Sequence, residues 1–257
     1  MTRLSYSSYL RVDELLALQE PISQPAHHDE MLFIVIHQVY ELWFKQIMHE
    51  IEAAIVCLNS AELLRVSKRF RRIHTIQKLL EAQVDILETM APQDFNQFRD
   101  NLNPASGFQS FQFREIEFLC GLKRTDHLKH LTMDDDQKKR LDRRLSEPSL
   151  FDALKNVLRD RGFTADTHDD LLLTFQTIYE AEQQHYDLYS LLEDFIEFDE
   201  RFLLWRGRHI RMVERMIGLK MGTGGSPGVT YLATTLEKKF FPELWEVRTS
   251  LGKGGYA

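Results

Sequence analysis

Glycine and proline are scarce in this sequence. Of its 257 residues, 12 are Gly and 7 are Pro, and these residue types interrupt helices and strands more strongly than any others. The strict alternation of apolar and polar residues that half-buried strands show is also missing. We therefore expect an all-α chain whose long helices form a bundle, organised as a single domain over residues 1–257.

Cysteine is nearly absent as well. Cys57 and Cys120 lie in separate apolar stretches without a CxxC spacing, so we expect free, buried thiols in a reducing compartment. The N-terminal residues contain no apolar run typical of a secretory signal. No stretch approaches the roughly 20 apolar residues that a membrane span needs. These features favour a cytoplasmic protein.

Positive charge is in deficit. The sequence contains 32 Lys and Arg against 39 Asp and Glu, which gives a formal net charge of −7. A net charge of this sign disfavours nucleic acid and anionic membrane surfaces as partners. We therefore expect neither among the partners of this protein.

Hydrophobic periodicity and helix breakers predict the organisation of the chain. The predicted helices cover residues 6–20, 29–60, 61–90, 111–121, an uninterrupted 169–206 that continues beyond Trp205, 229–238 and 240–247. The remaining parts are an N-terminal arm (1–25), a loop-rich segment (92–110) and a charged, exposed connection with one short helix (123–167). Within that connection, Ser149 and Asp152 have the spacing of a capping box.

Two of the ten histidines lie on the apolar faces of predicted long helices. His37 shares its face with Phe33, Tyr40 and Phe44 at helical spacing. His209 belongs to the stretch WRGRHIRMVERMIGLKMGTGGSPG, in which an amphipathic helix ends in a glycine cluster. A buried imidazole must form a hydrogen bond or bind a ligand. Both residues are candidates for a cofactor site, although ordinary core positions give the same pattern.

Two cofactor classes fit the sequence poorly. Glu182 and His185 form an ExxH, which di-iron helix bundles use, but the second ExxH that such a site needs is missing. The glycine cluster lacks the Lys-Ser/Thr ending of a P-loop and follows a helix rather than a strand. The ExxH is therefore interpreted as a polar surface or interhelical contact.

Haem fits the pattern better. A haem site needs one axial histidine on a helix, a wide apolar slot and distal groups that control what binds. His209, with Trp205 and Val213 around it, suits the proximal side, and His37 with Phe33 suits the distal side. The guanidinium of Arg99 could hold a substrate carboxylate. There is no CxxCH for covalent attachment.

Three long segments resemble the tryptophan 2,3-dioxygenase family. They are FIVIHQVYELWFKQIMHE (33–50), FRDNLNPASGFQSFQFR (98–114) and the stretch around His209 quoted above. YSSYLRVDELLALQ and HHDEMLF near the N-terminus match the family too. The resemblance covers most of residues 6–121 and 195–247 and is weak over 123–167.

The resemblance implies a fold and a reaction. Members of that family are cytoplasmic, all-α homotetramers (dimers of dimers) with one haem b per subunit. They insert both atoms of O₂ across the indole C2–C3 bond of L-tryptophan and produce N-formyl-L-kynurenine, the first step of the kynurenine pathway. A sensor that binds haem or tryptophan without turnover, and a metal-free helical interaction protein, are the alternatives from other functional classes.

The resemblance also implies residue roles. His209 matches the axial iron ligand, His37 the distal histidine that faces the indole N–H, Arg99 the partner of the substrate carboxylate, and Thr223 the hydroxyl at the substrate ammonium. His37 is expected to position the indole rather than to serve as an indispensable base. Further expected contacts are, for the substrate, Phe33, Phe95, Leu102 and Ser106, and, for the cofactor, Trp205, Phe113, Val213 and Gly107.

The resemblance also concerns the N-terminal arm, and the sequence departs from the family pattern at two places. Tyr6, Tyr9 and Leu10 match an arm that reaches into the site of a neighbouring subunit. Phe95 stands where some bacterial relatives carry Tyr, so we expect a second contact to the carboxylate to be missing. Ser226-Pro227 replaces a usual Ser-Ser and is expected to stiffen the loop beside Thr223.

Overall fold

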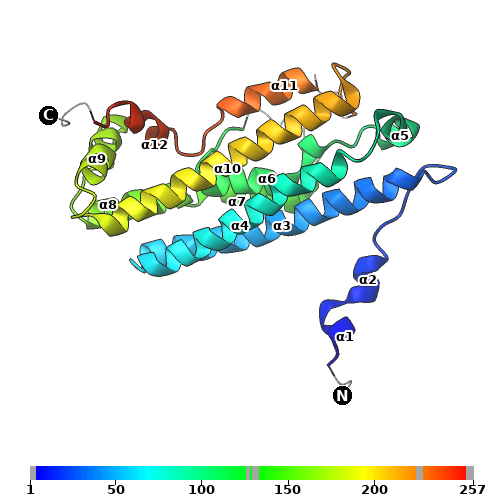
Figure 1. Cartoon of the computed structure of the whole chain (residues 1–257). Helices are drawn as coiled ribbons and strands as arrows, with labels where there is room; N and C mark the ends of the chain where they lie inside the picture. The colour runs from blue at the N-terminus through cyan, green and yellow to red at the C-terminus, as the bar shows by residue number, and fades with distance from the viewer. Residues whose placement is uncertain (1–3, 126–127, 129–132, 224–227, 253–257) are drawn as a thin grey trace.

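The computed structural model describes residues 4–125, 128, 133–223 and 228–252, and every regular element in these ranges is a helix (Figure 1). The all-α prediction is therefore confirmed. The α-helices are α1 Tyr6–Leu10, α2 Val12–Leu16, α3 His28–Asn59, α4 Leu63–Leu87, α5 Pro92–Phe98, α6 Phe111–Cys120, α7 Asp135–Ser146, α8 Leu150–Asp160, α9 His168–Glu180, α10 Tyr186–Ile217, α11 Val229–Ala233 and α12 Pro242–Glu246. Short 3₁₀ helices are η1 Arg99–Leu102, η2 Gly107–Gln109, η4 Thr234–Glu237 and η5 Val247–Thr249.

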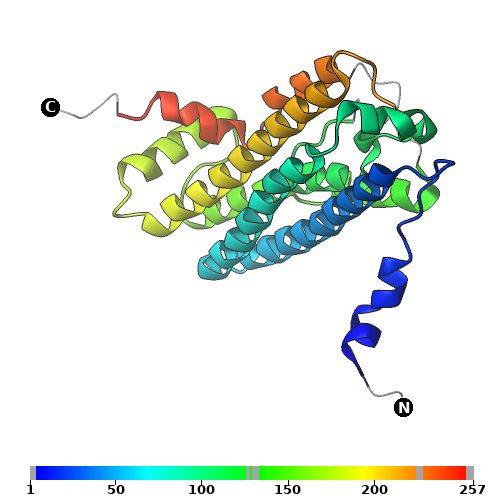
Figure 2. The same ribbon diagram turned by 45° about the vertical axis from the view of Figure 1, so that its right-hand side comes forward.

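Three long helices, α3, α4 and α10, form the centre of the structure. Helix α4 packs along both α3 and α10, whereas α3 and α10 make no close backbone contact with each other in the described chain (Figures 1 and 2). Helices α6 and α8 pack on α3, and α11 runs beside α10. Because α4 holds α3 and α10 apart, their facing side chains are free to line a cavity.

The core consists of two groups of buried side chains. The larger group joins α3, α4, α6, α8, α9, α10 and the C-terminal segment, and it includes the fully buried rings of Phe70, Phe198 and Phe241. The smaller group lies between α3, α4, α5 and α10 and includes Met212 and Met216. Each buried side chain of this size contributes roughly 1.5–3 kcal/mol to folding. The smaller group forms the floor of the cavity described below.

A buried carboxylate fixes the C-terminal segment to α10. Asp199 is fully buried, and its Oδ2 accepts hydrogen bonds from the backbone N–H groups of Phe240 (2.9 Å) and Phe241 (3.1 Å) and from Trp245 Nε1 (3.0 Å). Burial raises the pKa of Asp199, while these three donors oppose that effect. The segment after α11 is thereby held against the side of α10 that leads to His209.

The N-terminal arm stands away from the bundle (Figures 1 and 2). Instead of one helix over residues 6–20, it forms α1 and α2, because Arg11 between them adopts a left-handed backbone with φ 53°. Neither helix has a buried residue, and the side chains of Tyr6 and Tyr9 are 77% and 72% exposed. Within one chain the arm therefore has no core of its own.

The prediction of one continuous helix over residues 169–206 is wrong. Helix α9 ends at Glu180, a turn covers 181–185, and α10 begins at Tyr186. Helix α9 folds back and packs on α10 and α12, and the hydroxyl of Tyr179 donates to Glu193 of α10 at 2.7 Å. Tertiary contacts override the helix propensity of a stretch that lacks Gly and Pro. Glu182 and His185 thus lie in a turn and not on one helix face.

Two segments are more structured than predicted. Residues 92–110 contain α5, which begins with Pro92 in its first turn and buries Phe98 completely. Residues 133–160 contain α7 and α8 instead of one short helix in an exposed connection. Arg144 of α7 is buried and pairs with the fully buried Glu115 of α6 at 3.3 Å. The many charges of residues 123–167 predict exposed side chains, but this pair packs against α3.

No helix in the described part of the chain is both long enough and apolar enough to cross a membrane. The Cys57 and Cys120 thiols are free and buried, as expected. Burial raises the pKa of the Cys120 thiol well above its usual value, which keeps it protonated.

The capping box at the start of α8 can be tested by substitution. Burial raises the pKa of Asp152, but hydrogen bonds from Lys155 and Ser149 outweigh it and lower the pKa to about 2. A lowered carboxylate pKa stabilises the fold above the unfolded value near 3.8 and ceases to do so as the pH falls toward 2. We expect Asp152→Asn to lower the free energy of unfolding at pH 7 by about 1 kcal/mol.

Urea unfolding at several pH values measures this effect. The difference between Asp152→Asn and the unsubstituted protein should shrink as the pH falls below about 4, since the carboxyl of the unfolded chain is then protonated, and it should vanish near pH 2, where the folded carboxyl is protonated too. The control is Asp142→Asn on the exposed side of α7, which should change stability by less than about 0.5 kcal/mol. A pH-independent difference for Asp152→Asn would contradict the assignment of a charged cap.

Candidate active site

A largely apolar cavity of about 270 Å³ lies between α3 and α10 and is closed by α5, α6 and the segment before α11. Aromatic side chains form much of its wall. Phe113 and Trp205 pack in a tilted arrangement with 5.3 Å between ring centroids, and Trp205 also contacts Phe44 at 5.9 Å. The cavity is deep, apolar and lined by a few polar groups, as ligand sites usually are.

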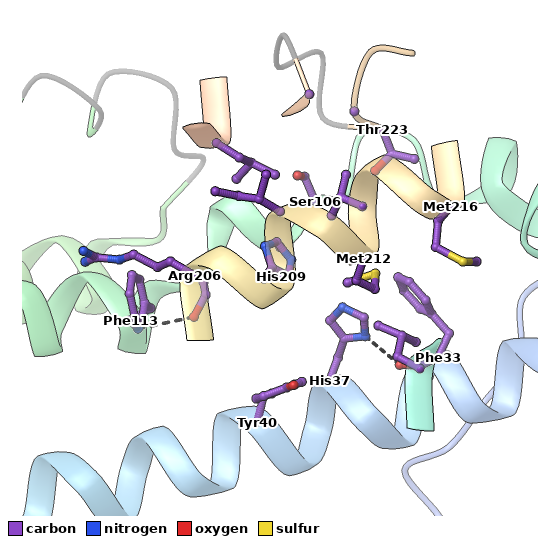
Figure 3. A pocket seen from close by; sticks show the side chains of 18 of the residues that line it. Phe33, His37, Tyr40, Ser106, Phe113, Arg206, His209, Met212, Met216 and Thr223 are labelled. Atoms are coloured by element: carbon purple, nitrogen blue, oxygen red, sulfur yellow. Dashed lines mark hydrogen bonds between the residues drawn. The ribbon is translucent and has the colours of Figure 1, made fainter. Parts of the chain in front are cut away.

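His37 points from α3 into this cavity (Figure 3). Its Nδ1 lies 2.7 Å from the backbone carbonyl oxygen of Phe33, one helical turn earlier, so Nδ1 carries the proton and donates it to that carbonyl. Burial lowers the pKa of His37, although the Phe33 carbonyl and the charge of Glu41 oppose that effect. The ring is therefore neutral at pH 7, and its Nε2 is left as a hydrogen-bond acceptor.

His209 points from α10 into the same space (Figure 3). Burial, assisted by the proximity of His37, lowers the pKa of His209 to about 4, so this imidazole is neutral as well. Trp205 stacks on it with 5.9 Å between ring centroids. Neither of its ring nitrogens has a hydrogen-bond partner among the described residues. A neutral, unpaired imidazole in an apolar wall is suited to bind a ligand through nitrogen.

The donor set fits haem. Haem iron takes one axial nitrogen from the protein, and the flat macrocycle needs an apolar, aromatic slot. His209 offers that nitrogen, and the rings beside it form the slot. Among the described residues no three His, Cys, Asp or Glu side chains are grouped to hold a bare metal ion.

Arg99 and Thr223 lie at one end of the cavity. Arg99 Nη2 donates to the carbonyl oxygen of Met221, while its Nε is buried without a partner. The hydroxyl of Thr223 donates to the carbonyl oxygen of Ala105 at 2.6 Å. Two segments distant in sequence, 99–105 and 221–223, therefore meet here. A guanidinium that keeps unpaired N–H donors, Nε among them, is a suitable partner for a carboxylate.

Most of the other predicted site residues line the same cavity. They are Phe33, Phe95, Ser106, Gly107, Phe113, Trp205 and Val213. Leu102 lines an adjoining cavity of about 330 Å³, which shares His37, Ser106 and Thr223 with the first. Tyr6, Tyr9 and Leu10 are not brought to the cavity, since they lie on the exposed arm. Ser226 and Pro227 fall outside the described residues.

Comparison with known proteins identifies the family of this chain. A sequence model described as "Tryptophan 2,3-dioxygenase" matches residues 1–176 and 159–251. The chain belongs to the tryptophan 2,3-dioxygenase family. Similar curated proteins carry that name in Herpetosiphon aurantiacus (48% identity over 96% of this chain and 98% of the relative), Nocardioides sp. (46% over 97% and 95%) and Xanthomonas euvesicatoria pv. vesicatoria (43% over 98% and 89%).

Membership in the tryptophan 2,3-dioxygenase family settles the class of reaction. These enzymes use O₂ to cleave the indole ring of tryptophan, and the family is haem-dependent in general. Catalysis is therefore favoured over a non-catalytic sensor. The apolar cavity with its two neutral imidazoles is the candidate active site of this dioxygenase.

Several residues of the dioxygenase site were not identified from the sequence. Met212 and Met216 line the cavity three and seven positions after His209, a helical spacing that could have identified them. Arg206 was missed because arginine is rarely buried. It is 4% exposed, donates to the carbonyl oxygen of Lys238 at 2.5 Å and pairs with Glu117 at 3.4 Å. It thus ties the segment after α11 to the helix that carries His209.

Gly228 makes a testable contribution to this dioxygenase site. Its φ is +62°, and a Cβ placed on it would lie 2.6 Å from the carbonyl oxygen of Lys220. Gly228→Ala should therefore displace the backbone that leads to Thr223. We expect the KM for tryptophan to rise by about tenfold, equivalent to roughly 1.4 kcal/mol of lost binding.

Steady-state kinetics measure this effect, with Gly218→Ala as the matched control. Gly218 has a similar φ of +60°, but nothing lies within 4 Å of its added Cβ. Both variants place alanine at a positive φ, and only Gly228→Ala has the clash. Equal KM values for the two variants would rule out this role of Gly228.

Proposed function

We propose that the cavity between α3 and α10 binds one haem b together with L-tryptophan, and that His209 would supply the protein ligand to the haem iron. The reaction converts L-tryptophan and O₂ to N-formyl-L-kynurenine. The indole C2–C3 bond breaks, each of these carbons gains one oxygen atom, and no further reductant is consumed. The observation that carries the proposal is the pair of neutral imidazoles that enter one apolar cavity from opposite helices.

The protein mainly orients the substrate. When bound, the haem iron supplies the place at which O₂ binds and becomes reactive. Arg99, whose Nε has no partner, binds the substrate carboxylate, and the Thr223 hydroxyl accepts from the ammonium group. Holding both ends of the amino acid fixes the indole edge in the cavity, and such orientation supplies a large part of a catalysed rate.

His37 accepts a hydrogen bond from the indole N–H in this proposal. The indole N–H is only a donor, and the Nε2 of His37 is an acceptor because its Nδ1–H is used by the Phe33 carbonyl. The two groups are therefore complementary. In this arrangement His37 positions the ring, and no transfer of the N–H proton is required before the ring reacts. Phe33, which packs on His37 with 4.1 Å between centroids, limits the freedom of the imidazole.

The N-terminal arm completes the site in an oligomer. Tyr6, Tyr9 and Leu10 are exposed large side chains that have no core to join in their own chain. Packing of this arm on a neighbouring subunit would bury them, and we propose that it does so beside that subunit's tryptophan site in a homotetramer. The proposed location is the cytoplasm.

An absorbance assay for formylkynurenine tests the proposed function. Ferrous, haem-loaded protein with O₂ and L-tryptophan should form the product. Absence of product from fully haem-loaded ferrous protein would refute the function and favour a sensor.

Removing the axial ligand should abolish stable haem binding. His209→Ala leaves a cavity with no nitrogen at the iron, so the Soret band should be lost or displaced and turnover should stop, whereas the far-UV circular dichroism spectrum should not change. Added imidazole should restore part of the Soret band. The control is His49→Ala, an exposed histidine of α3. A normal Soret band in His209→Ala would mean that another residue binds the iron.

Arg99 can be tested by a substitution that keeps its charge. Lysine cannot form the bidentate contact, so Arg99→Lys should lower kcat/KM for L-tryptophan by about tenfold to a hundredfold, the value of one to two charge-assisted hydrogen bonds. Tryptamine has no carboxylate, and its binding should be weak and insensitive to the substitution. Arg211→Lys on the exposed face of α10 is the control. An equal loss of tryptamine and tryptophan binding in Arg99→Lys would exclude a carboxylate contact.

A further inference from the structure

Glu41 is an acidic residue of the active site to which the reaction has not yet given a role. It lies on α3 one helical turn after His37 and lines both the main cavity and the adjoining one. Side chains at this spacing on a helix are neighbours, with about 5–6 Å between their Cβ atoms. A half-buried carboxylate beside an apolar cavity has a cost in solvation, so its contacts need an explanation.

Three hydrogen bonds keep Glu41 in place. Its Oε1 accepts from the hydroxyl of Ser110 at 2.7 Å, and its Oε2 accepts from the side-chain amide of Gln112 at 2.9 Å. The same amide also donates to the backbone carbonyl of Glu41 at 2.9 Å. Ser110 is the N-cap of α6, where its hydroxyl oxygen accepts from the N–H of Phe113. The carboxylate is thereby held between α3 and the segment that carries Ser106.

The cationic groups of the cavity are bound elsewhere. Arg206 is directed to the backbone carbonyl of Lys238 and to Glu117, and Arg99 donates to the carbonyl of Met221. Arg114, the third arginine that lines the cavity, pairs with Glu117 at 2.6 Å. None of the ion pairs resolved among the described residues involves Glu41. Its negative charge therefore acts on its surroundings. These include His37, one helical turn before it, whose pKa it raises against the effect of burial.

The chemistry of the substrate indicates a role for the negative charge of Glu41. Oxygen is an electron acceptor, so the indole loses electron density as the first carbon–oxygen bond forms, and its N–H becomes more positive. The hydrogen bond from that N–H to Nε2 transfers part of the positive charge to the imidazole of His37. A carboxylate next to the imidazole stabilises this charge in a medium of low dielectric constant.

We propose that Glu41 is a positioning residue of the dioxygenase that acts through His37. Its carboxylate stabilises the positive charge that spreads from the indole N–H to the imidazole in the transition state. This inference rests on the proposed role of His37 at the indole nitrogen. Because the charge appears only as the reaction proceeds, Glu41 should affect kcat and leave the KM for tryptophan nearly unchanged.

Glu41→Gln removes the charge with little loss of hydrogen bonding. The amide keeps an oxygen for Ser110, and Gln112 keeps its bond to the backbone carbonyl of residue 41. We expect kcat to fall by about tenfold, as estimated for a partial charge at this separation. KM and haem content should stay within about twofold of the values for the unsubstituted protein, and the melting temperature should stay within a few degrees. Glu41→Asp keeps the charge and should recover most of kcat. The matched control is Glu52→Gln, farther along α3 and 46% exposed.

A double-mutant cycle with His37→Ala tests whether the effect passes through the imidazole. In the His37→Ala background, Glu41→Gln should change kcat by less than about twofold, since the interacting pair is already broken. If His37→Ala is too slow to measure, 1-methyl-L-tryptophan, which has no N–H, takes its place in the comparison. Should Glu41→Gln match Glu52→Gln, or lower kcat equally in both backgrounds, the proposal is overturned. Failure of the unsubstituted protein to make formylkynurenine would instead refute the proposed function.

Discussion

Two long helices must each present one uncharged imidazole to the same apolar space, and the rest of the structure depends on this constraint. Helix α4 packs on both α3 and α10 and keeps them apart, so His37 and His209 face a cavity and not each other's backbone. Burial keeps both rings neutral, and neutrality is what the two proposed roles require. An axial ligand needs a free lone pair, and so does an acceptor for the indole N–H.

The surrounding contacts make this geometry rigid. The Phe33 carbonyl sets the tautomer of His37, and Trp205 packs against His209. Also on α10, Asp199 and Arg206 bind backbone groups of the C-terminal segment. These buried polar groups are expensive to desolvate, and they are retained where they fix a segment that borders the cavity. The two imidazoles thus stand on long helices, whereas the residues proposed to bind the amino-acid end of the substrate come from η1 and from the segment after α10.

Helical periodicity revealed the two central residues but could not assign their roles. His37 and His209 were identified because an imidazole on an apolar face is unusual, and the same spacing could have added Met212. Their roles came from the family resemblance, since iron ligation and a satisfied core histidine leave the same pattern in a sequence. The long segments α3 and α4 were predicted nearly to their ends for the same reason of strong periodicity.

Interactions between distant segments account for what the sequence did not reveal. No Gly or Pro in the sequence indicates the break between α9 and α10. The break results from packing such as that of Tyr179 on α10. The buried pair of Glu115 and Arg144 belongs to two helices, and each residue alone is typical of an exposed surface. The meeting of Arg99 with the Met221 carbonyl likewise joins segments more than a hundred residues apart.

The most direct test of the account is a crystal structure of the protein with haem and L-tryptophan bound. The account predicts iron ligated by His209, an indole N–H within hydrogen-bond distance of His37 Nε2, and the substrate carboxylate on the guanidinium of Arg99. Iron ligated by any other side chain, or tryptophan bound with its indole nitrogen turned away from His37, would contradict it.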